Sequence, residues 1–225
     1  MLEQLVALAV PPCCAVCRAP ARTPAGVLCG ACLRELPWLS AQSCERCALP
    51  LPHPARRSCP ARDAAFDLAW SAVAFEGVAR DALHALKFSA ARPLARVMAA
   101  QIAASAPPAL LAGGPTLVAV PAHPGRRRSR GFDPADLLTR ALARGTGLER
   151  ARPLRRSAGA RQSGAPRAVR LQPGRLGFHA VAQSPRQVVL VDDVHTTGAT
   201  LHACAQALRE AGAERIVAVA WARAL

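Results

Sequence analysis

The sequence has no tyrosine, and aromatic residues make up only 4% of its 225 positions. Proteins that hold single-stranded nucleic acid commonly stack bases on aromatic side chains, so this composition disfavours a protein built mainly for that task. No apolar run approaches the roughly 20 residues that a membrane-spanning helix needs. We therefore expect no membrane insertion.

The N-terminal residues also lack the marks of an export signal. Residues 5–10 are apolar, but no basic stretch precedes them and no small-residue cleavage site follows them before the first cysteine. These features predict that a secretory signal is absent and that the protein is cytoplasmic.

Negative charge is scarce. The chain has 29 Lys and Arg against 14 Asp and Glu, a formal net charge of +15. Such a balance attracts polyanions or phosphorylated small molecules. Lys87 is the only lysine, and the many alanines and prolines point to a compositional bias that accounts for part of the arginine excess. The charge therefore indicates a class of partner and not a function.

Eight of the nine cysteines lie within residues 13–59 and recur as C-x2-C pairs. Two sulfurs at i and i+3 on a tight turn can face one metal ion, and two such turns form a closed tetrahedral site. The first two pairs therefore predict a zinc ribbon with the ligands Cys14, Cys17, Cys29 and Cys32. The alternative is a disulfide framework, but disulfides belong to oxidising compartments, and nothing here directs export.

The third pair, Cys44 and Cys47, forms a candidate second zinc site with Cys59. A fourth C-x2-C pair would end at Arg62, which leaves His53 as the nearby histidine able to complete the ligand set. Whether this second cluster binds zinc stays open. The many prolines of this region prevent a sizeable core, so metal would supply the folding energy of a module over residues 1–62.

Residues 63–225 alternate between strand and helix patterns. Strands are expected at 68–75, 116–120, 187–191 and 216–221, and helices at 77–104, 133–144 and 200–211, with a loop at 107–115 and an ambiguous arginine-rich stretch at 151–178. Strands that alternate with helices predict a mainly parallel sheet flanked by helices. The expected fold class is α/β with a small N-terminal zinc-ribbon module.

Residues 188–200 carry the strongest chemical signal. An apolar strand is followed by Asp192 and Asp193 and then by a Thr- and Gly-containing loop that opens into a helix. Loop amides and a helix N-terminus can hold a phosphate, while the carboxylates can accept hydrogen bonds from ribose hydroxyls or hold a divalent cation. Taken singly, each feature also fits a helix cap or a turn. Together they predict a site for a sugar phosphate.

This string resembles the phosphoribosyl pyrophosphate (PRPP) signature of type I phosphoribosyltransferases, and the chain as a whole resembles the ComF/GntX family. Besides the cysteine ribbon, the resemblance rests on Lys87 in residues 84–88, on residues 118–123 with 127–132, and on Gln162, Arg170 and Phe178. It implies a type I phosphoribosyltransferase-like domain that binds PRPP with Mg²⁺, beside structural Zn²⁺.

The resemblance also implies roles for individual residues. It makes Asp192 and Asp193 the catalytic, ribose-contacting pair, and residues 121–128 the pyrophosphate side. Lys87 and residues 151–177 would bring positive charge over the pyrophosphate. The full set of implied PRPP-binding residues is Asp192, Asp193, Thr196, Thr197, Gly198, Ala199, Thr200, Lys87, Arg128 and Arg130.

The chain departs from the family pattern at several positions. Asp133 and Pro134 stand where the pattern has Asn and Gln, and Pro173 replaces a later Asn, so amide side chains are lost. If those amide side chains recognise the acceptor substrate in the family, transfer to an acceptor is expected to be weakened or altered in this chain. His195 replaces an apolar residue and is expected to be a packed or solvent-facing loop residue and not a proton-transfer group.

Three functional hypotheses follow. The first is a phosphoribosyltransferase with an unidentified acceptor. The second is a single-stranded-DNA-binding or DNA-uptake accessory protein linked to the competence machinery, and the third is a regulator that senses PRPP or a nucleotide without turning it over. We expect phosphate binding by Arg126, Arg127 and Arg128, whereas the sequence does not assign a role to Arg152, Arg155 and Arg156.

Overall fold

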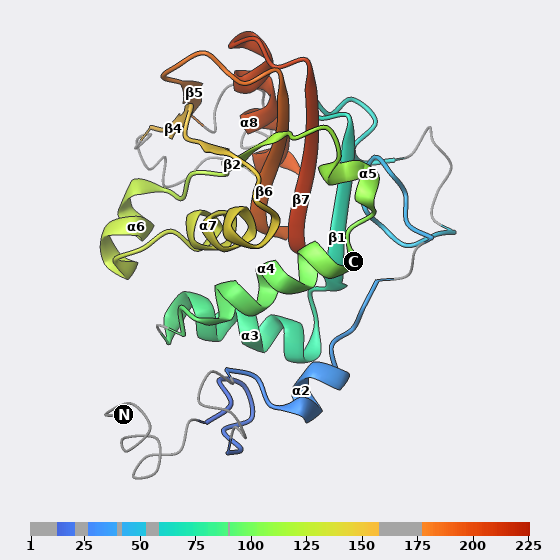
Figure 1. The fold of residues 1–225 in the computed structure, drawn as a ribbon, viewed down its shortest axis with the longest axis vertical. Helices are drawn as coiled ribbons and strands as arrows, with labels where there is room; N and C mark the ends of the chain where they lie inside the picture. The colour runs from blue at the N-terminus through green and yellow to red at the C-terminus, as the bar shows by residue number, and fades with distance from the viewer. Residues whose placement is uncertain (1–12, 21–26, 40–41, 53–58, 90, 158–176) are drawn as a thin grey trace, which may run out of the picture.

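The computed structural model describes residues 13–20, 27–39, 42–52, 59–89, 91–157 and 177–225 (Figure 1). Its main feature is a five-stranded sheet in the order β1-β7-β6-β2-β3, in which every neighbouring pair is parallel. The strands are β1 (Leu68–Ala74), β2 (Thr116–Ala119), β3 (Arg150–Ala151), β6 (Gln187–His195) and β7 (Arg215–Arg223), and β4 (Leu154–Arg156) pairs with β5 (Phe178–Ala180) in a separate antiparallel ribbon. This arrangement confirms the mainly parallel α/β sheet.

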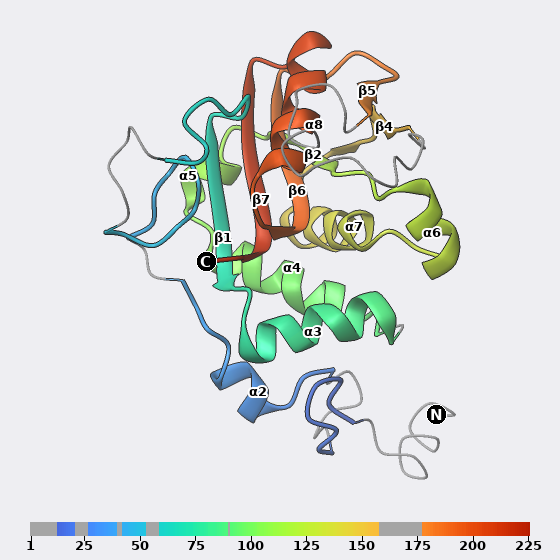
Figure 2. The ribbon, with the colours of Figure 1, turned by 180° about the vertical axis from the view of Figure 1, so that it is seen from behind.

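Helices cover both faces of the sheet (Figures 1 and 2). They are α2 (Gly30–Arg34), α3 (Gly77–Phe88), α4 (Leu94–Ser105), α5 (Pro108–Leu111), α6 (Pro124–Arg130), α7 (Pro134–Thr146) and α8 (Ala199–Glu210). Alternate residues of β6 enter two separate cores. Val189 and Val191 pack with α3, α4 and α7, whereas Val188 and Leu190 pack with α8. Burial on both faces explains why β6 is an unbroken apolar run.

The connections between the strands reverse direction in the middle of the sheet. From β2 the chain passes through α6 and α7 to β3 on one side, and from β6 it passes through α8 to β7 on the other. Because β2 and β6 are neighbours, the carboxyl ends of these two strands meet at a topological switch point. In open α/β sheets that crevice is where ligands bind.

Three expected elements differ in the structure. The single helix expected at 77–104 is two helices, because Pro93 lacks a backbone N–H and disfavours a helical conformation in the preceding residue. The loop expected at 107–115 contains the short helix α5, and part of the expected pyrophosphate loop at 121–128 is the helix α6, with Pro124 at its first turn.

A further difference concerns β6, which does not end at Val191 but continues to His195. Asp192 and Asp193 therefore lie inside the strand near its carboxyl end. The reason is pairing: Asp192, Val194 and His195 remain in register with β7. Residues 158–176, which include Gln162, Arg170 and Pro173, lie outside the described residues, as do residues 1–12 and His53.

The N-terminal module contacts both cores. Cys14 and Cys32 belong to the apolar cluster that contains α3, whereas Cys47 and Cys59 belong to the cluster that contains α8. The segment between them follows the free edge of β1, where Leu39 N–H donates to Ala72 O and Ala74 N–H donates to Pro37 O. Covering an edge strand in this way prevents pairing with other chains. Among the described residues no helix has the length and apolar character needed to cross a bilayer.

Candidate functional site

Asp192 and Asp193 occupy the carboxyl end of β6, at the switch point. Successive residues of a strand point to opposite faces, so the two carboxylates do not face the same side of the sheet. Asp193 is buried and forms an ion pair with Lys87, with 2.9 Å between Lys87 Nζ and Asp193 Oδ2. Lys87 lies in the last turn of α3. The structure thus brings together two residues that the motif comparison had picked from segments more than 100 positions apart.

Asp192 faces the α8 side, and its Oδ1 accepts the backbone N–H of Asp193 at 2.8 Å. Desolvation and the neighbouring charge of Asp193 raise the pKa of Asp192 well above its ordinary value. A hydroxyl donor or a cation placed beside this carboxylate would relieve that cost. A donor beside Asp192 would thus stabilise the charged form of this carboxylate, whereas Asp193 already has Lys87 as its partner.

Residues 196–198 connect β6 to α8, where the sequence predicts a phosphate-binding loop. Gly198 precedes α8 with a φ of +79°, a left-handed conformation that favours glycine. A side chain there would also approach His195, since an added Cβ would lie 3.0 Å from Nε2. Thr196 and Thr197 are exposed, and Thr197 Oγ1 accepts the Ala199 N–H at 3.4 Å. The first turn of α8, with Thr200, thus presents backbone amides and hydroxyls at the switch point.

His195 is a packed residue, as expected, but it ends a strand and is not part of the loop. It is 2% exposed, and its ring meets Phe66 edge to face with 6.2 Å between centroids. Burial, with a smaller contribution from the Arg223 charge, lowers its pKa to about 3.

The pKa of His195 makes a prediction about acid stability. In the unfolded chain this histidine titrates near 6.5, so between pH 6.5 and about 3 only the unfolded state binds the proton. His195 should therefore lower the free energy of unfolding by about 1.4 kcal/mol per pH unit as the pH falls through this window. Urea unfolding of wild type and His195→Asn at pH 7.0, 6.0 and 5.0 should show a shallower decline for the variant, and parallel curves would contradict the prediction.

Arg223 forms hydrogen bonds to the start of the loop at residues 196–198. This residue ends β7 and is 3% exposed. Its guanidinium donates to His195 O at 2.9 Å and Thr196 O at 2.5 Å on one side, and through Nε to Cys47 O at 2.7 Å on the other. Arg223 therefore joins the start of the loop at residues 196–198 to the second cysteine cluster. Sequence reasoning missed this residue, because nothing in an arginine at a strand end signals that it is buried.

The expected pyrophosphate side is the segment that leads through α6. His123 precedes this helix and its Nδ1 accepts the Gly125 N–H at 3.2 Å. Arg130 lies over the Phe88 ring at 5.2 Å, next to Lys87 along α3, whereas Arg128 is exposed. Arg130 thus contacts the residue that follows Lys87 in α3, and Arg128 is exposed to solvent without a described contact at the acidic pair.

Asp133, one of the departures from the family pattern, has a structural role. Its Oδ1 accepts the Ala135 and Asp136 N–H groups and caps α7, and its Oδ2 accepts the Ala122 N–H at 2.8 Å. Pro134 follows at the first helical position, which suits a residue without an N–H. Burial raises the pKa of Asp133. Asp133 and Pro134 therefore fix the start of α7, and Asp133 also ties it to the segment that follows β2.

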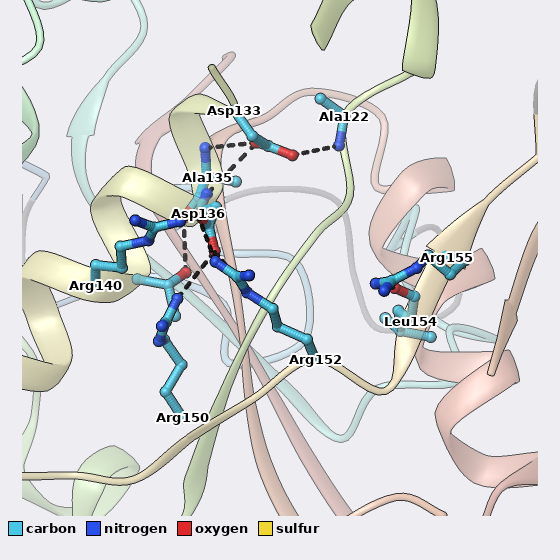
Figure 3. Close-up of polar contacts among 10 residues, drawn as sticks. Ala122, Asp133, Ala135, Asp136, Arg140, Arg150, Arg152, Leu154 and Arg155 are labelled. Atoms are coloured by element: carbon cyan, nitrogen blue, oxygen red, sulfur yellow. Dashed lines mark hydrogen bonds and ion pairs between the residues drawn. The ribbon is translucent and has the colours of Figure 1, made fainter. Parts of the chain in front are cut away.

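Beside this turn lies a cavity of about 360 Å³ that sequence reasoning did not identify. Its charged lining is formed by Arg92, Arg127, Arg140, Arg152, Arg155, Asp133 and Asp136. Figure 3 shows Arg140, Arg150 and Arg152 converging on Asp136, while Arg155 lies apart from them. The Asp136–Arg140 spacing of four residues was the only local signal for this cluster.

The first cysteine cluster fits a tetrahedral metal ion. The sulfurs of Cys14 and Cys32 are 3.7 Å apart and those of Cys17 and Cys29 are 3.5 Å apart. A tetrahedral ion with Zn–S bonds of about 2.3 Å requires sulfurs about 3.8 Å apart. These four thiols, all within 4.8 Å of one another, are the expected ligands.

The second cluster, Cys44, Cys47 and Cys59, also has its sulfurs within 4.8 Å of one another. Its backbone repeats that of the first cluster 30 positions later. Arg18 N–H donates to Cys14 O and Ala48 N–H donates to Cys44 O, and both donors have a positive φ, 64° and 57°. Cys13 bridges Pro20 as Ser43 bridges Pro50. The repeated turn supports a second metal site, with Arg62 in the position that corresponds to Cys32.

One comparison with known proteins concerns the cysteine-rich module. Residues 5–62 match the family model of the double zinc ribbon domain. This match and the cysteine clusters confirm the zinc-ribbon module and support structural zinc. A search of curated proteins found no match.

Among solved structures, this chain is similar to the allosteric regulatory enzyme of purine biosynthesis, with 22% identity and a TM-score of 0.38 over 56% of this chain and 24% of that one. It is also similar to glutamine PRPP amidotransferase from B. subtilis, complexed with ADP and GMP, with 24% identity and a TM-score of 0.38 over 56% of this chain and 26% of that one. This chain spans about a quarter of the length of those proteins.

Proposed function

We propose that this protein binds PRPP with Mg²⁺ at the switch point between β2 and β6 and transfers its phosphoribosyl group to an acceptor. The proposal rests on one observation: the carboxyl ends of β2 and β6, where crossovers diverge, carry an acidic pair and a glycine-hinged loop that opens into α8. A phosphate at that loop and ribose hydroxyls at the carboxylates would satisfy both sets of groups.

The residues would divide the work as follows. Residues 196–200 would hold the 5′-phosphate through backbone N–H groups and threonine hydroxyls. Asp192, whose raised pKa reflects a poorly solvated carboxylate, would accept hydrogen bonds from the ribose. Lys87, held by Asp193, and Arg130 nearby would bring positive charge toward the pyrophosphate.

In the reaction, the acceptor atom would form a bond to the anomeric carbon as the bond from that carbon to pyrophosphate breaks. Positive charge develops on the ribose and negative charge on the leaving pyrophosphate, so carboxylates on one side and cations on the other stabilise the transition state. The two carboxylates carry one more negative charge than Lys87 balances, and Mg²⁺ held by Asp192 or Asp193 would neutralise the leaving group.

Calorimetric titration of PRPP and Mg²⁺ into zinc-loaded protein tests the proposal. We expect saturable binding to wild type and at least a tenfold loss in Asp192→Asn, since a carboxylate accepts charge-assisted hydrogen bonds that an amide does not replace. Asp63→Asn is the matched control, because Asp63 is an exposed aspartate whose ion pair is with its sequence neighbour Arg62. Binding would justify an acceptor screen that follows pyrophosphate release, whereas no binding to wild type would overturn the proposal.

We further propose that the protein is a cytoplasmic member of the ComF family and that its role is linked to DNA uptake. Support comes from the motif resemblance and from α6, which has no buried residue and carries Arg126, Arg127 and Arg128 on its exposed surface. The test measures the binding constant for a single-stranded oligonucleotide at several salt concentrations. This role predicts that the logarithm of the binding constant falls linearly with the logarithm of the salt concentration, and that the slope is smaller in Arg126→Gln/Arg128→Gln. If the protein bound no single-stranded oligonucleotide at low salt, the role in DNA uptake would be ruled out.

A further inference from the structure

The second cysteine cluster brings together three ligands where the first brings together four. The sulfurs of Cys44, Cys47 and Cys59 lie within 4.8 Å of one another. Those of Cys44 and Cys59 are 4.0 Å apart, close to the roughly 3.8 Å that a tetrahedral ion with Zn–S bonds of about 2.3 Å requires. Within the described part of the chain, three thiolates thus mark three corners of a tetrahedron, and no further Cys, His, Asp or Glu joins them.

Arg62 lies at the position where the first cluster has its fourth cysteine. Cys32 follows Cys29 by three positions, and Arg62 follows Cys59 by the same interval. The chain turns at both places, since Leu33 N–H donates to Cys29 O and Arg62 N–H donates to Cys59 O, each at 3.0 Å. A guanidinium has no lone pair to offer a metal ion. Arg62 therefore cannot take the role of Cys32.

The fourth position of the second cluster is exposed to solvent, whereas that of the first is buried. Cys32 is 3% exposed and packs in the core that contains α3. The side chain of Arg62 is 63% exposed, and its ion pair is with the exposed neighbour Asp63. Cys47 and Cys59 are buried. An ion at this cluster would therefore be covered by protein on the side of its thiolates and accessible from solvent at the remaining corner.

Arg46 holds the turn at position 62 in place. This residue lies between Cys44 and Cys47 in the sequence. Its Nη2 donates to three carbonyl groups of the turn, those of Ala61, Arg62 and Ala64, at 3.2, 3.3 and 3.1 Å. Because these bonds tie the turn to the loop that carries two of the ligands, they oppose a backbone shift that would bring another group to the open corner.

The charges beside the cluster favour an anionic fourth ligand. A zinc ion bound by three thiolates carries one negative charge in excess, and a fourth thiolate adds another. The guanidinium of Arg223, which is 3% exposed, donates through Nε to Cys47 O at 2.7 Å. A buried positive charge at this place offsets part of the added negative charge. Thiolate is also a ligand type that zinc binds well, which makes a thiol the class of small molecule that suits this corner.

We propose that the second cluster binds zinc through Cys44, Cys47 and Cys59 and takes a small thiol from solution as its fourth ligand. On binding, the thiol sulfur forms a bond to zinc, the water molecule that otherwise fills this corner leaves, and the thiol proton passes to solvent. Zinc sites with three protein ligands keep an exchangeable position, unlike closed structural sites with four. The inference goes beyond the proposed function and does not depend on PRPP binding.

Cobalt(II) in place of zinc in the full chain tests this proposal, because absorption from thiolate-to-cobalt charge transfer follows the number of bound sulfurs. Adding 2-mercaptoethanol to wild type should raise this absorption by about one seventh, as expected for eight bound thiolates in place of seven. Arg62→Cys should have the higher absorption from the start and show no further rise, since its own thiolate fills the corner. Asp63→Cys is the matched control, which adds a thiol one position away and should respond as wild type does.

Release of zinc to a chelator, without added thiol, gives a second measurement. Wild type should lose one of its two zinc ions at least about tenfold faster than the other, because fewer protein ligands hold it. Arg62→Cys should remove most of this difference. Arg62→Ser removes the arginine without supplying a thiolate, so its fast release should stay within about twofold of wild type. Equal slowing in Arg62→Ser and Arg62→Cys would show that the arginine alone sets the rate and would overturn the proposal.

Other results would also contradict an open corner. We expect His53→Ala to respond to 2-mercaptoethanol as wild type does; if wild type gave no response and His53→Ala did, this histidine would be the fourth ligand and the inference would fail. A wild type that holds one zinc ion per chain would overturn it as well. The PRPP titration is a separate measurement, so a failure of the proposed function would leave the open zinc site standing.

Discussion

Replacing Cys32 with serine is expected to remove one zinc ion per chain and to lower the free energy of unfolding by several kcal/mol. A structural zinc site contributes about 10–16 kcal/mol in apparent terms, and loss of one thiolate forfeits a large part of it. Cys32 is 3% exposed and lies 3.7 Å, sulfur to sulfur, from Cys14. Both cysteines pack in the core that contains α3, so the loss should reach the sheet-bearing part of the chain.

Zinc content by elemental analysis, together with urea unfolding, measures this effect. Cys13→Ser is the matched control, since Cys13 is adjacent in sequence to the ligand Cys14 but does not belong to the group of four clustered sulfurs. Cys59→Ser should separately remove the zinc of the second cluster. If Cys32→Ser kept the zinc content of wild type, the ligand assignment would be wrong.

Replacing Lys87 with methionine should also lower the free energy of unfolding substantially. Asp193 is 7% exposed, and its ion pair with Lys87 is the cation contact that the structure gives this carboxylate among the described residues. Removing one partner of such a buried pair costs about 3–5 kcal/mol, because the remaining charge stays desolvated. We also expect PRPP binding to fall strongly, since Lys87 is proposed to face the pyrophosphate.

A double-mutant cycle tests the cause of the stability loss. In Lys87→Met/Asp193→Asn the charge of Asp193 is removed together with that of its partner, so the double variant should be more stable than Lys87→Met alone. Urea unfolding of the four proteins at pH 7 measures the coupling. An additive result, with no recovery in the double variant, would mean that the lost stability comes from packing of the lysine stem.

The sequence predicted the site best where one short segment carries all of its parts. The strand, the acidic pair, Gly198 and α8 follow one another within residues 187–210, so local patterns were enough. The end of β6 was not predictable in this way, because pairing with β7 extends the strand across two charged residues. Pro93 indicated the break before α4. The apolar periodicity of residues 77–104 nevertheless led to the prediction of one continuous helix.

The arginine cavity could not be predicted, because its contacts depend on how β3 lies against α7. Arg150 and Arg152 reach Asp136 across 14 and 16 positions of sequence, and only the parallel pairing of β3 with β2 sets that distance. The same holds for Arg223, whose partners lie 27, 28 and 176 positions away. The charge composition predicted attraction to anions, but it did not indicate which arginines would lie together.

The hydrogen bonds of Arg223 have a thermodynamic consequence. One guanidinium holds the carbonyl of a metal-cluster residue, Cys47, and two carbonyls at the start of the phosphate loop. If ordering either side favours the other, coupling must be reciprocal: whatever a bound ion at the second cluster adds to phosphate affinity, a bound phosphate adds to metal retention. Zinc should then leave for a chelator more slowly when PRPP is present, and this dependence should vanish in Cys59→Ser. The ribbon would act as a partner in ligand binding as well as a support for the fold.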